Sequence, residues 1–242
     1  MVGLVMVAQV TDNKDPEGYG RIKVKLLGYL TGVEVWLRML NPYGSSAAGS
    51  VFLPEVDDEV LVLRGAEDRL EGMYILGALY NATRKPVYDN ADGANITKQI
   101  KTKAGNLFAF SDKAGEEGIT LQSKAGSKIV INDKSDTNGF TIANADGTIS
   151  IVLDKTGASI TVAKGQPATI TVAGDATISA DGKVTVKSGG DASVTAGGNL
   201  TVKGTANATL EAGAQLTVKG GAKIGIEAPM VEIKGATMVK IN

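Results

Sequence analysis

The sequence has no cysteine and no histidine, and its 242 residues include only one tryptophan and four phenylalanines. The absence of cysteine excludes disulfide bonds and thiol chemistry. The absence of histidine removes the commonest general base and the commonest side-chain ligand for metal ions. We therefore expect a protein that is not an enzyme, with no catalytic, cofactor-binding or metal-binding residues.

An excess of one charge is also lacking, because 25 lysines and arginines face 26 acidic residues, for a net charge of -1. This balance does not favour nucleic acid or an anionic membrane as a partner. No apolar run is long enough to span a bilayer. The first ten residues, MVGLVMVAQV, lack a basic region and indicate a first strand rather than a signal peptide.

Glycine, in contrast, is abundant, with 31 residues, and an eight-residue repeat begins at Gly174. Its blocks read GDATISAD, GKVTVKSG, GDASVTAG, GNLTVKGT, ANATLEAG, AQLTVKGG and AKIGIEAP. The third and fifth residues of each block are apolar, and a small, mostly hydroxylic residue stands between them. This alternation has the period of a β-strand, and the Gly, Asp, Asn and Ala residues at the block ends suit corners.

A single block cannot enclose a core, because it turns only two side chains inward. Three chains wound together solve this problem if each supplies one short strand per layer. The apolar pairs then meet at the axis and the threonine column faces solvent. We therefore interpret the repeat as an intertwined trimeric β-helix, a needle with a triangular cross-section. Its candidate trimer-core residues are Val184, Val186, Val194, Leu200, Val202, Leu210, Leu216, Val218, Ile224 and Ile226.

Residues 1–81 differ from the repeat and predict a separate domain, since they hold Trp36 and five of the six tyrosines. Alternating apolar patterns between turn residues predict strands at 4–10, 20–27, 34–39, 59–63 and 73–79. Five short strands favour a small closed barrel of the OB type. We expect Trp36 in the barrel core. The acidic run Asp57-Asp58-Glu59 is interpreted as a solvated turn rather than a cation site.

Residues 82–97 are polar and rich in turn formers, so they are expected to form a linker or neck. From Lys98 the apolar alternation returns, with pairs ten or so residues apart that settle to eight after Gly174. The expected architecture is therefore all-β, with an OB-fold barrel over 1–81, a neck over 82–97 and a trimeric β-helix spike over 98–242.

Several separated motifs carry a resemblance to a known family. They are Gly20-Arg21-Ile22-Lys23-Val24, Val35-Trp36-Leu37-Arg38, Phe52-Leu53-Pro54-Glu55-Val56-Asp57-Asp58 and Ile75-Leu76-Gly77-Ala78-Leu79. In this order they resemble the OB-fold domain of baseplate spike proteins, which include the phage baseplate protein V type and the VgrG proteins of type VI secretion. The stretches 100–106, 108–112 and 118–123 are similar to the VgrG neck.

The resemblance implies a structural, membrane-piercing central spike of a contractile injection machine, such as a phage tail, a tailocin or an extracellular injection particle. Such a spike is assembled in the bacterial cytoplasm and acts outside the cell at the target envelope. The lysozyme domain that some members carry between barrel and stalk has no room in this neck. We do not expect in this chain the hub domains that precede the barrel in VgrG, and a separate hub protein is expected to carry the trimer.

The resemblance also bears on the tip of the needle. Some members close it with a His-x-His motif that holds iron, which a sequence without histidine cannot do. Others carry a separate cap protein of the PAAR type. We therefore expect such a cap at the C-terminal end of this chain, where the strand pattern stops. The residues nearest the junction are Met238, Val239, Ile241 and Asn242.

Two other functions fit parts of the sequence. A trimeric adhesin or receptor-binding stalk predicts a globular binding head after the repeat. An OB-fold nucleic-acid-binding protein with a multimerising tail predicts salt-dependent binding to single strands.

Overall fold

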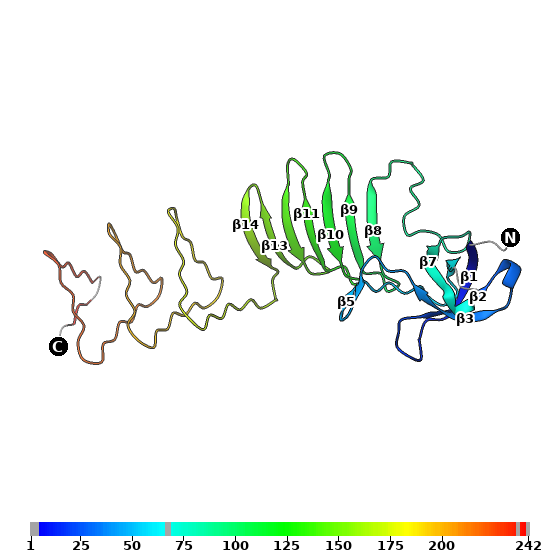
Figure 1. Cartoon of the computed structure of the whole chain (residues 1–242). Coiled ribbons are helices and arrows are strands. Elements are labelled where there is room, and N and C mark those ends of the chain that lie inside the picture. Colours follow the sequence, from blue (N-terminus) through cyan, green and yellow to red (C-terminus); the bar gives the residue numbers. More distant parts are fainter. Residues whose placement is uncertain (1–4, 66–68, 236–237, 241–242) are drawn as a thin grey trace. The chain divides into compact units, whose positions relative to one another are not determined.

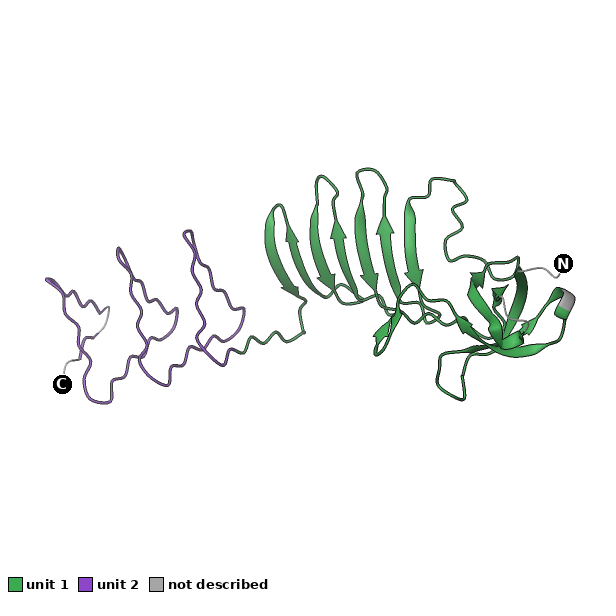
Figure 2. Cartoon of the chain, in the orientation of Figure 1, with its two compact units in different colours: residues 1–171 green, residues 172–242 purple. Residues whose placement is uncertain are grey.

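The computed structural model describes residues 5–65, 69–235 and 238–240. By its internal contacts the chain divides into two units, residues 1–171 and 172–242, which Figure 2 shows in different colours. The first unit contains a barrel and a sheet, and the second contains the eight-residue repeat. Each unit is described by itself.

The N-terminal part is a closed five-stranded barrel with the strand order β1-β2-β3-β7-β6 (Figure 1). Neighbouring strands are antiparallel, except that β3 and β7 run parallel. The strands are β1 (Val5–Asp12), β2 (Ile22–Leu26), β3 (Glu34–Met39), β6 (Glu59–Arg64) and β7 (Met73–Leu79). All five strands that the sequence predicts are confirmed. The connections hold two 3-10 turns, Gly28–Leu30 and Leu70–Gly72, and a small hairpin of β4 (Gly44–Ser45) and β5 (Ala48–Gly49).

Alternation along each barrel strand decides which side chains fill the core. The buried core residues are Ala8, Val10, Ile22, Val24, Leu26, Val35, Leu37, Val60, Val62, Met73 and Ile75. The prediction that Trp36 belongs to this core is wrong. Val35 and Leu37 take the two inward positions of β3, so the side chain between them points to the outer face, where it is half-buried opposite Lys23.

The turn between β1 and β2 is organised around the carboxylate of Asp15. This carboxylate is 4% exposed and forms two hydrogen bonds with the Arg21 guanidinium, at 2.8 and 3.1 Å. It also accepts hydrogen bonds from the backbone N–H groups of Glu17, Tyr19 and Arg21. These donors, the Arg21 side chain foremost, hold the pKa of Asp15 well below its ordinary value of 3.8.

We predict that Asp15→Asn weakens the barrel and removes part of its acid sensitivity. Because the pKa of Asp15 is lower in the folded state, its stabilising contribution is fully present above pH 3.8 and is lost as the pH falls toward the folded-state value. The single tryptophan lies in the barrel, so fluorescence of Trp36 in the full chain reports barrel unfolding. Acid midpoints that coincide in the two proteins would show that Asp15 has no such role.

Residues from Thr97 to Val162 form a seven-stranded antiparallel sheet in which each strand pairs with the next along the chain (Figure 1). Its strands are β8 (Thr97–Lys101), β9 (Leu107–Ser111), β10 (Gly118–Gln122), β11 (Lys128–Asn132), β12 (Gly139–Ala143), β13 (Ile149–Asp154) and β14 (Gly157–Val162). Over this stretch we expected each chain to supply one strand per layer, and the structure differs. A spacing of about ten residues holds one strand and one reversing turn, so the chain pairs with itself.

The repeat behaves differently from the sheet. The chain bends at residues 173–174 and then every eight residues, at 181–182, 189–190, 197–198, 205–206, 213–214 and 221–222. These bends coincide with the block junctions of the sequence. No described residue after Val162 belongs to a strand. Figure 1 shows this part, from yellow to red, as a chain that coils in successive wide turns.

Candidate functional site

The register of the seven-stranded sheet places most of its large apolar side chains on one face, with Leu107, Val130 and Val152 on the other. They form two ladders that cross the strands, and neighbouring members are directly paired. The first ladder consists of Phe110, Ile119, Ile131, Phe140 and Leu153. The second consists of Ile100, Phe108, Leu121, Ile129, Ile142, Ile151 and Ile160. We call these two ladders the apolar face.

The side chains on the opposite face of the sheet are mostly smaller and more polar. This face carries Gln99, Thr120, Thr141 and Ser159 in one paired row, together with Ala109, Val130 and Val152. One face of a sheet is expected to be dry and the other wet when the sheet packs on a single side. The apolar face therefore has the composition of a side that packs against other protein.

Within a single chain the apolar face remains open. Leu121 is 46% exposed and Ile160 is 73% exposed, and most other members of the two ladders are also exposed by a third or more. A buried aliphatic side chain contributes about 1.5–3 kcal/mol relative to an exposed one. Large exposed apolar patches mark interaction sites. The apolar face thus has the character of an interface between chains.

The candidate trimer-core residues of the repeat also lack cover within the chain. Val186 is 90% exposed, and the nine others are all exposed by half or more. Beyond Gln166, no backbone–backbone hydrogen bond joins two described residues. Backbone N–H and C=O groups in a folded protein are almost always paired. The repeat therefore requires partners for its backbone as well as for its side chains.

The expected tip lies partly outside the described residues. Met238 and Val239 are 76% and 48% exposed. Ile241 and Asn242 lie outside the part of the chain that the structure describes. The described residues hold no group of three or more His, Cys, Asp or Glu side chains with the spacing of a metal site.

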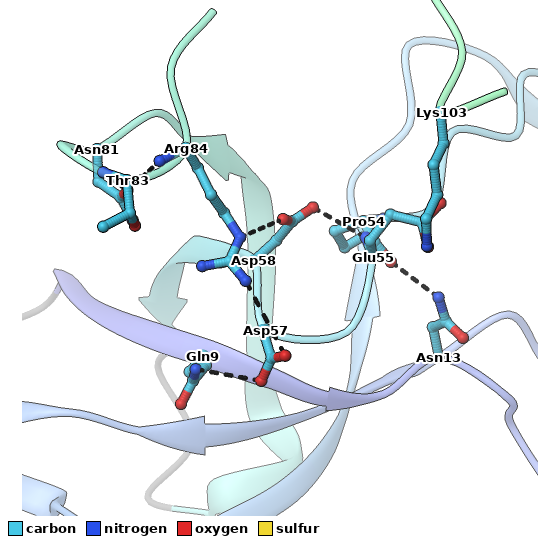
Figure 3. Close-up of polar contacts among 10 residues, drawn as sticks. All are labelled: Gln9, Asn13, Pro54, Glu55, Asp57, Asp58, Asn81, Thr83, Arg84 and Lys103. Carbon is cyan, nitrogen blue, oxygen red and sulfur yellow. Dashed lines mark hydrogen bonds and ion pairs between the residues drawn. The ribbon is translucent and has the colours of Figure 1, made fainter. Parts of the chain in front are cut away.

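The acidic run at the start of β6 is held by a residue of the neck. Figure 3 shows Arg84 beside this turn, with its Nε 3.1 Å from Oδ1 of Asp58 and its Nη2 4.0 Å from Oδ2 of Asp57. Asp58 also accepts a 2.9 Å hydrogen bond from the backbone N–H of Glu55. These contacts fit the expected turn rather than a cation site, and they give the neck residue Arg84 a structural role.

A second ion pair ties the same loop to the sheet. Nζ of Lys103, in the turn between β8 and β9, lies 2.9 Å from Oε2 of Glu55 (Figure 3). The hydrogen bond that Lys103 donates to the Glu55 carboxylate raises the pKa of Lys103 above its ordinary value. Sequence analysis missed both Arg84 and Lys103. Their partners are far away along the chain, and an exposed lysine or arginine carries no local signal of the carboxylate that it meets.

Comparison with known families fits this geometry. Residues 6–80 match the family model described as the type VI secretion system/phage-baseplate injector OB domain. Residues 98–185 match the model described as the phage baseplate V C-terminal trimerisation domain. No curated protein matches the chain.

The fold is therefore an OB domain joined to a β-rich trimerisation domain, the combination of a structural baseplate component. The chain belongs to the family of baseplate spike proteins. As a member it is a component of a phage or secretion-system tail, and the trimerisation domain supports a homotrimer. Among the described residues, no helix has the length and apolar character needed to cross a membrane.

Proposed function

We propose that the protein is the central, membrane-piercing spike of a contractile injection machine, such as a phage tail, a tailocin or an extracellular injection particle. The observation that carries the proposal is the open repeat, whose described residues expose their apolar side chains and form no backbone–backbone hydrogen bonds with one another. Three interlaced chains supply both kinds of partner and leave no lateral edge open. A prism of this kind resists buckling when sheath contraction drives it into an envelope.

The barrel end of the trimer docks on a hub protein at the end of the inner tube. The match of residues 6–80 to a baseplate injector OB domain supports a docking role for this end. The role is mechanical, so it needs no catalytic residue, cofactor or nucleic acid. The spike assembles in the bacterial cytoplasm and acts outside the cell at the target envelope.

Electron microscopy of the purified full-length protein tests the proposal directly. We expect a thin needle attached to a wider head, and sedimentation velocity is expected to show a trimer. Unwinding three interlaced chains requires many layers to open together, so the trimer is also expected to survive detergent gels unless it is boiled. Compact monomeric particles would contradict the proposed function.

The C-terminal end of the needle carries a cap protein of the PAAR type, seated near Met238, Val239, Ile241 and Asn242. The exposed apolar side chains of Met238 and Val239 support this part of the proposal, since exposed apolar side chains favour a partner that covers them.

We predict that Val239→Asp lowers occupancy of the cap on assembled particles while the trimer persists. The change places a carboxylate among apolar side chains at the end of the axis. Burial of such an unpaired charge costs several kcal/mol. Lys240→Asp is the matched control, since alternation turns residue 240 outward. An assembled particle whose apex is closed by this chain's own residues, or by a metal that they bind, would contradict the cap.

A further inference from the structure

The charged residues of the repeat follow a pattern that its apolar core does not explain. The second and sixth residues of each block flank the inward pair and point outward, because side chains of a strand alternate. In successive blocks the sixth position holds Lys203, Glu211, Lys219 and Glu227, which alternate in sign. The second position alternates in the same way over its first three blocks, with Asp175, Lys183 and Asp191.

Within these two columns, the sign of a charged residue relative to another depends on whether the two are eight or sixteen residues apart. From Gly174 to Pro229, charged residues eight apart in the second or sixth column always have opposite signs. Those sixteen apart always have the same sign, and these pairs are Asp175 with Asp191, Lys187 with Lys203, Lys203 with Lys219, and Glu211 with Glu227. The remaining second positions, up to Lys223, are the amides Asn199, Asn207 and Gln215, which are compatible with either spacing.

Among the described residues of their own chain these charges find no partners. Lys203, Glu211, Lys219 and Glu227 are exposed, and none forms an ion pair or a hydrogen bond within the described residues. The bend at each block junction turns the chain, so consecutive blocks of one chain do not continue in one line. Figure 1 shows this coiling. The opposite charges eight residues apart are therefore available to other chains.

We propose that the three chains of the needle are staggered by one block, so that residue i of one chain stacks on residue i+8 of the next, and that the alternating charge columns set this register. The inference rests on the interlaced needle proposed above. Parallel strands lie about 4.8 Å apart, so Lys203 of one chain would lie beside Glu211 of its neighbour. Opposite charges directly across a strand pair stabilise it, and like charges destabilise it.

The apolar pairs alone do not define the stagger, because nearly every block carries the same pattern. A strand with a uniform pattern is prone to slip along its partner. A slip by one block would set lysine beside lysine and glutamate beside glutamate. The charge columns therefore exclude the alternative registers that a homotrimer of near-identical blocks would otherwise allow.

Cysteine cross-linking measures the stagger directly, in a full-length chain that has no cysteine of its own. In Thr201→Cys/Thr209→Cys, a one-block stagger brings cysteines of different chains about 4.8 Å apart, within the Cα range of a disulfide. Mild oxidation is expected to give covalent dimers and trimers on non-reducing gels. Thr201→Cys/Thr217→Cys places them about two layers, or 9.6 Å, apart, and is expected to stay uncross-linked, as is Thr209→Cys alone.

Each outcome of this experiment decides the register. A trimer by sedimentation that cross-links in Thr209→Cys or Thr201→Cys/Thr217→Cys overturns the one-block stagger and leaves the spike standing. A trimer with no cross-link in Thr201→Cys/Thr209→Cys also overturns it. A link formed only within single chains, or the absence of a trimer, overturns the interlaced needle itself.

Charge inversion tests whether the columns set the register. In Glu211→Lys, the sixth column holds three lysines in succession, at positions 203, 211 and 219. We expect their repulsion to speed dissociation of the trimer in detergent about tenfold. Inverting all four charges, with Lys203→Glu, Glu211→Lys, Lys219→Glu and Glu227→Lys together, restores the alternation and the original rate. Lys187→Glu is the matched control, since its column neighbours are Ser179 and Thr195. Equal rates for Glu211→Lys and the fourfold variant would overturn the role of the charges.

Discussion

Val186→Asp is expected to abolish the trimer or fray the needle around its block. Val186 is an inward residue of the repeat and is 90% exposed in a single chain, so any cover must come from the other two chains. The substitution brings three carboxylates together at the axis. Burial of each unpaired carboxylate destabilises the trimer by several kcal/mol. Sedimentation velocity and unboiled detergent gels report the loss.

Thr185→Asp is the control for this change. It introduces the same side chain one residue away, but alternation turns residue 185 outward to solvent. We expect Thr185→Asp to sediment as a trimer and to keep its resistance to detergent. Equal tolerance of the two substitutions, or a folded monomer in either case, would show that the repeat does not form an interlaced core.

Leu121→Asp is expected to disrupt the trimer at the sheet. Leu121 lies in the second ladder of the apolar face, between Phe108 and Ile129, and it is 46% exposed in one chain. Packing of three such faces would bury the exposed part of Leu121, which stabilises the trimer by about 1 kcal/mol per chain. The carboxylate forfeits this stabilisation in addition to its own desolvation. Sedimentation velocity is expected to show a shift toward monomer.

Gln122→Asp provides a neighbour on the same strand but on the opposite face. Gln122 is exposed and pairs with Leu107 and Lys128 rather than with the ladders. We expect this variant to remain trimeric, with circular dichroism spectra like those of the unchanged protein. A trimer that loses as much stability from Gln122→Asp as from Leu121→Asp would mean that the apolar face is not the interface.

The barrel shows how far local patterns reach. Alternating apolar residues between turn formers were enough to place all five strands, because turn chemistry and strand period act over a few residues. The prediction that Trp36 lies in the core was wrong because these local patterns do not determine the register. Its size suggested the core, but the register of β3 gives the inward positions to Val35 and Leu37, and register depends on partner strands.

The stretch 97–162 shows a different limit. Its apolar alternation predicted strands with one dry face, and the structure has such strands. Whether a strand pairs with its own chain or with another depends on the residues available between strands. About ten residues per repeat allow a reversing turn, and the sheet accordingly pairs within the chain, whereas eight residues per block after Gly174 do not give such pairing.

The candidate site residues also differ in whether a local sequence pattern marks them. The apolar positions of the repeat could be named from the sequence, since period two marks them residue by residue. Arg84 and Lys103 could not, because their carboxylate partners at Asp58 and Glu55 come close only when the neck and the sheet lie against the barrel loop. The cap-binding role of the tip residues Met238 and Val239 stays a proposal, because neither the sequence pattern nor the structure decides it.

The sequence by itself determined the all-β class, the strands of the barrel and the eight-residue blocks, because each of these depends on turn residues and on alternation over neighbouring positions. Only the tertiary structure decided that the stretch from Thr97 to Val162 closes its hydrogen bonds within one chain, that the Trp36 side chain lies on the outer face of the barrel, and that Arg84 holds the acidic turn. These outcomes depend on which distant segments meet, and the free energy that selects among such pairings comes from burial and hydrogen bonding across the whole fold rather than from any one stretch of chain.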